Sequence, residues 1–150
     1  ITMALKQSLH ALGTIPMPIP TGPGLCAVRT TYTLTADLAA NDIIEMGLLP
    51  ANCVPVDLIL DNDDLDSGTT ATASIGFLTT AKDDLTGALW LTTSTALRTA
   101  ATGTRADALG LHSMSRVTPT NTQRSYGVKI TADTDATSGT IGLTLMYRLA

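Results

Sequence analysis

An acidic run in the middle of the chain holds the residues that come nearest to a chemical site. Asp61, Asp63, Asp64 and Asp66 stand close together, and carboxylate oxygens are the ligands that Ca²⁺ takes in proteins. The run does not match the helical calcium loop, because Leu65 is the fifth residue and Asp66 stands in the sixth place, where that loop requires Gly. We therefore predict a solvated acidic turn, which discourages edge-to-edge pairing of strands. A calcium site at these four residues is the alternative.

The other residues able to do chemistry are few and scattered. His10 and His112 are far apart, and neither a Gly-x-Ser-x-Gly motif nor a phosphate-binding Gly-Lys-Ser/Thr sequence accompanies them. Cys26 and Cys53 are too few and too widely spaced for a usual zinc site. We expect buried free thiols, with a disulfide between them as the alternative. The sequence thus predicts no catalytic residues, no cofactor and no enzymatic activity.

Two stretches with the pattern of half-buried strands flank the acidic run. In residues 54–60, Val and Leu occupy alternate positions, and in residues 70–77 apolar residues alternate with Thr, Ser and Gly. A period of two is typical of a strand with one buried face. We predict that these two strands form a hairpin whose tip is the acidic turn, with Ser67 and Gly68 returning the chain.

The same alternation recurs along the chain. It predicts strands at residues 28–34, 125–131 and 140–149, and the last two are expected to form a hairpin around the turn at 133–139. Residues 42–49 permit a helical turn or a strand, and we favour a strand. Several strands at this spacing, without amphipathic helices between them, indicate an all-β fold: an antiparallel β-sandwich or jelly roll.

The stretch at residues 79–118 is irregular in pattern. A short helix at residues 85–90 is permitted, whereas Thr, Ser and Gly in the following residues favour loops, and one strand is expected at residues 109–117. Trp90 is the single tryptophan. It is predicted either to lie in the core or to anchor a contact with a neighbouring protein, since Trp is enriched at binding hot spots.

Residues 1–24 are predicted to form a Pro-rich extended N-terminal arm, separate from a β-sandwich domain at residues 25–150. Leu5, Leu9 and Leu12 have helical spacing that permits a turn or two of helix, but Pro16, Pro18 and Pro20 require an extended chain. Apolar side chains are unfavourable in water. The arm is therefore expected either to lie on a neighbouring subunit or to fold back on its own domain, and its predicted interface residues are Leu5, Leu9, Leu12, Ile15, Met17 and Ile19, together with Trp90.

The charge and the apolar content of the chain limit the classes of partner that it is expected to bind. The net charge is −4, the isoelectric point is near 4.8, and no run of Lys and Arg occurs, so we expect no nucleic-acid partner. No apolar stretch is long enough to span a membrane, and no secretory signal is evident, so no membrane partner is expected. Only 15% of residues are charged, while about one in six is Thr, and weakly charged surface of this kind favours burial against other subunits.

Several segments resemble those of a known group of proteins. In amino-acid sequence and in order, four segments are similar to those of virion structural proteins of tailed bacteriophages: residues 33–61, the loop at 63–68, and the closing segments 124–130 and 138–148. The chain looks most like a small capsid-associated head decoration, or cement, protein. The resemblance covers residues 30–148 and does not include the arm.

This resemblance implies a function. Proteins of this group commonly form homotrimers on the outer surface of the capsid, where they bridge neighbouring capsomers of the major capsid protein and stabilise the head. We therefore expect a non-enzymatic structural protein located in the virion, on the outside of the shell. The alternative is a phage fibre, tail or receptor-binding β-sandwich module that recognises a cell-surface glycan or protein.

Overall fold

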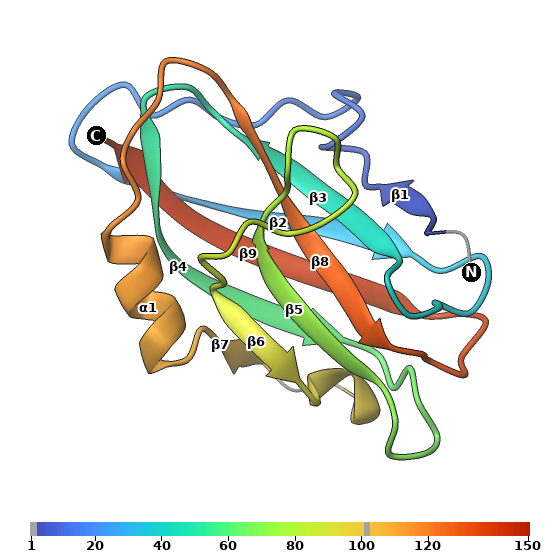
Figure 1. Ribbon diagram of the computed structural model, residues 1–150. Coiled ribbons are helices and arrows are strands. Elements are labelled where there is room, and N and C mark those ends of the chain that lie inside the picture. The colour runs from blue at the N-terminus through green and yellow to red at the C-terminus, as the bar shows by residue number, and fades with distance from the viewer. Residues whose placement is uncertain (1–2, 101–102) are drawn as a thin grey trace.

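The structure, a computed structural model, describes residues 3–100 and 103–150 and consists of two facing β-sheets (Figure 1). The elements are β1 (Leu5–Gln7), β2 (Leu25–Thr33), β3 (Ile43–Leu49), β4 (Cys53–Asn62), β5 (Thr72–Phe77), β6 (Leu91–Ser94), a 3-10 turn (Ala96–Arg98), β7 (Thr104–Arg105), α1 (Ala108–Ser115), β8 (Arg124–Ala132) and β9 (Thr140–Leu149). Strands were predicted in the right places for β2, β3, β4, β5, β8 and β9.

The order of the strands is that of a jelly roll. One sheet runs β1-β3-β8-β5-β6 and the other β2-β9-β4-β7. From β2 onward, strands near the two ends of the chain pair with each other, and so do strands nearer its middle. Thus β2 pairs with β9, β3 with β8, β4 with β7 and β5 with β6, all antiparallel. This is the pattern of a long hairpin rolled into two sheets, and it confirms the predicted all-β sandwich or jelly roll.

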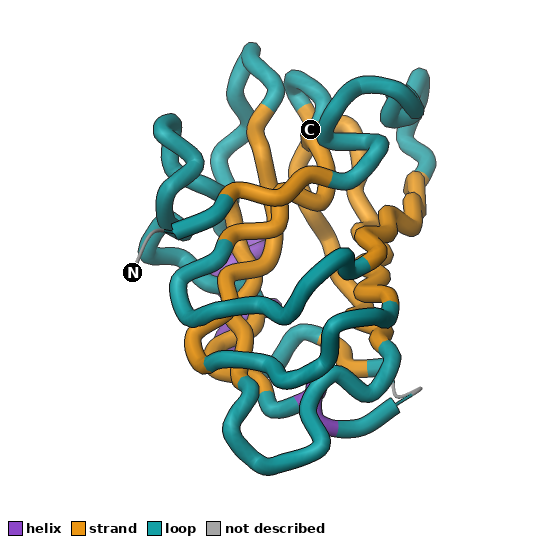
Figure 2. The backbone as a smooth tube through the Cα atoms, turned by 90° about the vertical axis from the view of Figure 1, so that its right-hand side faces the viewer, coloured by secondary structure: helices purple, strands orange, loops and turns teal. Residues whose placement is uncertain are grey.

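The core lies between the two layers of strands, which stand side by side in Figure 2. Strand β9 shows why the sequence folds this way, because Ile141, Leu143, Leu145 and Tyr147 all point inward and are fully buried. The residues between them face outward. Burying one such side chain contributes about 1.5–3 kcal/mol, so the four together stabilise the central strand strongly.

Both predicted hairpins are wrong, because the connected strands belong to different sheets. The predicted partners β4 and β5 lie in opposite sheets, as do β8 and β9. Residues 63–71 and 133–139 are therefore crossings between the layers rather than hairpin turns (Figure 1). Both exceed the two to five residues of a usual hairpin loop, whereas the alternation that predicted the strands does not say which sheet each strand joins.

The two crossing loops bind each other. The Leu65 carbonyl oxygen accepts from the Asp135 and Ala136 N–H groups at 3.3 and 3.2 Å, and the Ser67 N–H donates to Asp135 Oδ1 at 2.9 Å. The Leu65 side chain is fully buried. The acidic run thus closes one end of the sandwich instead of forming a free hairpin tip.

Asp66 organises its own loop. Its carboxylate accepts from the N–H groups of Ala71 at 2.7 Å, Thr70 at 2.8 Å and Gly68 at 3.2 Å. These bonds, led by the one from Ala71, lower the pKa of Asp66 below its ordinary value of 3.8. The charged form of this side chain therefore holds the turn that leads into β5.

The strand predicted at residues 109–117 is also wrong. Residues 109–117 form helix α1 and the turn after it rather than a strand, because Asp107 caps the helix: its Oδ1 accepts from the Gly110 N–H at 2.6 Å. Residues 5–12 contain strand β1 followed by turns, and residues 85–90 contain no helix. In the last two segments the helix that the spacing of Leu permits does not form.

Helix α1 packs on the aromatic part of the core. Phe77 and Trp90 meet edge to face with ring centroids 4.7 Å apart, and Tyr126 lies 6.2 Å from Trp90. Gly110 brings α1 against the Trp90 backbone, since a Cβ on Gly110 would lie 1.7 Å from the Trp90 carbonyl oxygen. Only glycine allows this approach.

We expect Gly110→Ala to lower the free energy of unfolding by about 3 kcal/mol, because α1 must move away from Trp90 to accommodate the methyl group. Urea unfolding followed by Trp fluorescence measures the loss. Gly87→Ala is the matched control, since a Cβ there has no atom within 4 Å and the change should be nearly neutral. Equal stability of the two variants would contradict this packing.

We also expect Asp66 to contribute to acid sensitivity. Its pKa is lower in the folded chain than in the unfolded chain, so its stabilisation is present above about pH 4 and is lost as the pH falls through the folded value. Asp66→Asn should reduce stability at neutral pH and flatten its decline below pH 4 in unfolding experiments across pH. Asp37→Asn, which alters an exposed carboxylate that accepts no hydrogen bond in the described chain, should leave the profile unchanged.

Candidate assembly interface

The N-terminal arm begins as an extra strand of its own chain. Strand β1 pairs in parallel with β3, with Leu5, Lys6 and Gln7 opposite Ile43, Ile44 and Glu45. Asp42 secures it, since its carboxylate accepts from the Ala4 N–H at 2.9 Å and from Lys6 Nζ at 2.7 Å. Burial alone would raise the pKa of Asp42, but the bonds from Lys6, Ala4 and Ala39 lower it. The start of the arm is thus fixed on its own domain.

Further along, the arm is attached at two polar points. Ser8 is buried: its N–H donates to the Glu45 carbonyl oxygen at 3.0 Å, and its hydroxyl donates to the Met46 carbonyl oxygen. The Tyr147 hydroxyl donates to the Pro18 carbonyl oxygen at 2.5 Å. Since Tyr147 is fully buried, the second point joins the arm to the core.

Between these attachments, and directly after the second, the arm presents apolar side chains to solvent. The exposed fractions are 53% for Leu9, 57% for Leu12, 42% for Ile15 and 68% for Ile19. Leu5 is also exposed, whereas Met17 is half-buried against the core. We call Leu9, Leu12, Ile15 and Ile19 the arm face. All four are among the residues predicted to form an interface, and here they are exposed.

Trp90 differs from the other predicted interface residues. It is fully buried in the aromatic cluster. Of the two roles predicted for it, core residue or contact with a neighbour, it therefore has the first. It has no surface with which to contact a neighbour, and it is removed from the predicted interface.

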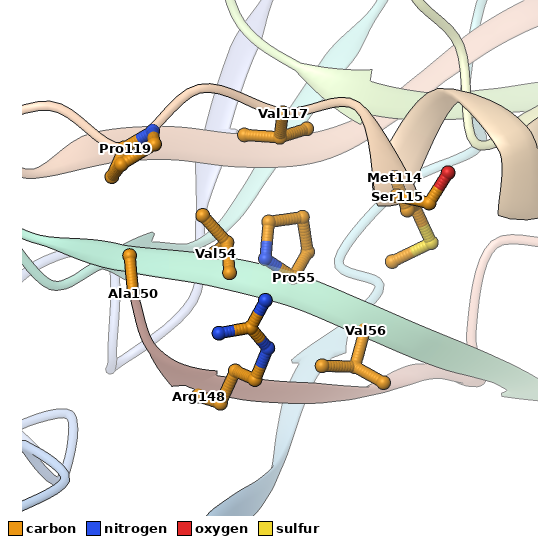
Figure 3. Close-up of a pocket in the computed structure, with 9 residues that line it drawn as sticks. All are labelled: Val54, Pro55, Val56, Met114, Ser115, Val117, Pro119, Arg148 and Ala150. Atoms are coloured by element: carbon orange, nitrogen blue, oxygen red, sulfur yellow. The ribbon is translucent and has the colours of Figure 1, made fainter. Parts of the chain in front are cut away.

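A second apolar surface is the groove between the start of β4, the end of α1 and the end of β9. It has a volume of about 340 Å³ and is lined by Val54, Pro55, Val56, Met114, Ser115, Val117, Pro119, Arg148 and Ala150. Figure 3 shows Val117 and Met114 above β4, with the Arg148 guanidinium extended towards Pro55. No carboxylate, imidazole or thiol is among these lining residues. The groove therefore suits contact with an apolar surface rather than acid-base chemistry.

The four acidic residues of the candidate calcium site all accept hydrogen bonds from the chain itself. Asp61 Oδ2 accepts from Arg29 Nε at 3.0 Å, Asp63 Oδ2 from the Thr140 N–H at 2.8 Å, and Asp64 Oδ1 from the Asp66 N–H at 3.3 Å. Asp66 is engaged by its own loop. Within residues 3–100 and 103–150, no group of three acidic, His or Cys side chains is placed to hold a metal ion.

The remaining candidate residues lie on separate elements. His10 lies in the arm and His112 in α1, and Cys26 and Cys53 are free thiols. Burial raises the pKa of the Cys53 thiol, aided by the nearby Cys26. No helix in the described residues is long and apolar enough to cross a membrane.

The aromatic residues bear on sugar recognition. Trp90, Tyr126 and Tyr147 are fully buried, and Phe77 is 9% exposed. Only Tyr32 is half-buried. A receptor-binding module for glycans needs exposed rings on which sugars can stack, and the described residues present little of this kind.

Two ion pairs, Arg29 with Asp61 and Lys82 with Glu45, were not predicted from the sequence. Arg29 and Asp61 reach across β9 above Gly142, where a Cβ would lie 2.6 Å from either Asp61 oxygen. Glu45 is fully buried and binds Lys82 Nζ at 3.0 Å and Ser125 Oγ at 2.7 Å. An isolated Gly within a strand is the signal that could have indicated the first, since it marks a close approach.

No protein-family model matches the chain, and no curated protein sequence matches it. Solved structures do. A chain in the capsid of Ralstonia phage GP4 is 36% identical, with 98% of this chain and 99% of that chain covered and a TM-score of 0.83. A chain in the capsid asymmetric unit of cyanophage Pam1 is 17% identical, with 92% and 96% covered and a TM-score of 0.63, which shows the same fold.

The likeness to the GP4 chain extends over nearly the whole length of both proteins, arm included. The chain belongs to the family of phage capsid proteins that includes this component of the GP4 capsid, and it is a structural protein of the phage virion.

Proposed function

We propose that this protein decorates the outer surface of a phage capsid as a homotrimer, bridges neighbouring capsomers of the major capsid protein and stabilises the head. The observation that carries the proposal is the arm face, four apolar side chains that their own chain leaves largely in water. Covering them on assembly contributes favourable free energy at each copy, and many copies act together on one particle.

The charge of the protein supports a location outside the shell. A net charge of −4 is unfavourable beside packaged DNA, whose phosphates repel an acidic protein. Several charged side chains are already paired within the chain, including Arg29 with Asp61 and Arg105 with Asp57. The remaining Thr-rich surface suits repeated contacts between subunits. No catalytic step is part of the proposed role.

The division at residue 24 also remains part of this proposal. We propose that residues 25–150 form the body of the decoration protein and that the arm contacts neighbouring proteins. Strand β1 holds the start of the arm on its own domain, so the exposed part between Leu9 and Ile19 is the segment free to contact a neighbour.

The test is the stability of heads with and without this protein. Heads assembled without it should lose their contents at lower temperature, and adding the protein back should restore the wild-type transition in a fluorescence release assay with a DNA dye. Heads that are equally robust in its absence would contradict the stabilising role.

A variant with Leu9, Leu12, Ile15 and Ile19 changed to Ser tests the arm face. We expect binding to heads to weaken by more than about a hundredfold, because the apolar area that assembly covers is lost. The isolated subunit should melt as before, since these side chains are exposed. Leu109→Ser is the control, because Leu109 is 77% exposed on α1, outside the arm face.

A further inference from the structure

Strand β2 is the edge of the four-stranded sheet and has one free side. It pairs with β9 without a break from Leu25 to Thr33, and the Leu34 N–H continues the ladder by donating to the Gly139 carbonyl oxygen at 2.8 Å. Backbone groups alternate between the two sides of a strand. The even-numbered residues of β2 therefore direct their backbone N–H and C=O groups to β9, as Leu34 does. Ala27, Arg29 and Thr31 direct theirs to the free side.

These free-side groups have no backbone partner in residues 3–100 and 103–150. The sandwich is also incompletely closed here. Val28 and Tyr32 point towards the core but remain half-buried, whereas Thr30 between them is fully buried. A long edge strand with unpaired groups and partly uncovered inner side chains is a site at which another strand can add.

The arm contains a segment suited to add on one side only. Prolines at positions 16, 18 and 20 lack N–H groups, while Ile15, Met17 and Ile19 between them have them. In an extended chain, alternate residues direct their N–H and C=O groups to the same side. One side of this segment can therefore pair with a strand, and the other side cannot donate.

The attachment of the arm leaves the pairing side available. Pro18 directs its carbonyl oxygen to the Tyr147 hydroxyl of its own chain, which places the proline side towards the domain. The N–H groups of Met17 and Ile19 have no acceptor within the described chain, whereas the Ile15 N–H donates to the Leu9 carbonyl oxygen at 3.3 Å. The donors that remain available are therefore those of Met17 and Ile19, and Ile19 is 68% exposed. The side that can donate thus faces away from its own domain.

Charge also permits contact between the segment and β2. Residues 14–24 contain no charged side chain, and the one charge of β2, on Arg29, is already paired with Asp61. Pairing would therefore bury no unpaired charge. Burial of an unpaired charge is strongly unfavourable at an interface.

We propose that residues 15–19 of one copy add as an extra strand to the free side of β2 in a second copy. This inference rests on the proposed homotrimer and supplies its contact. The two surfaces differ, so the contact is head to tail and three of them close a ring. The proline side of each added segment then prevents a further strand from joining, which stops growth of the sheet at that point.

The experiment uses the full chain and one variant for each partner strand. Ile19→Pro removes an N–H from the pairing side while keeping the arm extended and apolar, and Thr31→Pro removes one from the free side of β2. In each, the concentration at half-assembly, measured by light scattering, should rise about tenfold or more. Pro16→Ala, which changes the opposite side of the segment, should assemble as the wild type does.

Amide hydrogen exchange supplies the direct readout. In the assembled wild type, the amides of Ala27, Arg29 and Thr31 should exchange slowly, and in Ile19→Pro they should exchange as fast as those of an exposed strand edge. A trimer in which these three amides exchange rapidly, and which Ile19→Pro leaves unchanged, overturns this pairing and leaves the proposed function standing. A wild-type chain that stays monomeric both in solution and on heads overturns the homotrimer and the pairing together.

Discussion

The pairing of β9 with β2 on one side and β4 on the other is the contact on which the rest of the structure depends. It joins the first strand of the rolled sheet to the last along the full length of both, with β4 continuing the sheet beyond. Four buried side chains on the inner side of β9 supply the apolar surface for the facing layer. Once β2 and β9 are paired, β3 and β8 lie opposite each other, and the remaining pairs follow towards the middle of the chain.

Individual strands were predictable, whereas their neighbours were not. The alternation in residues such as Val128 and Ile130 states which face of a strand is buried, and it holds whatever strand lies alongside. The two predicted hairpins failed for this reason, since nothing in the alternation says that a loop crosses to the other sheet. The cross-links that hold those loops, such as the Ser67 N–H donating to Asp135, join positions far apart in the sequence.

The candidate interface shows a similar limit. Exposed apolar residues such as Ile15 and Ile19 could be recognised because the adjacent prolines exclude them from a regular core element. The place of Trp90 could not, because an apolar neighbourhood in the sequence is equally compatible with core and contact. Helix α1 was missed because its cap, Asp107, acts over a single turn that resembles an ordinary polar loop. The ion pair over Gly142 depends on two strands that are neighbours only through β9.

The central position of β9 has a consequence for how the protein is made. Strands β2 and β4 leave the ribosome well before β9, and neither has its main partner until that strand follows. The nascent chain therefore carries unfinished sheet edges through most of its synthesis, and its four-stranded sheet forms late, from segments far apart in sequence. A chain whose four-stranded sheet is completed only when β9 has been made has no finished surface to offer other virion proteins earlier.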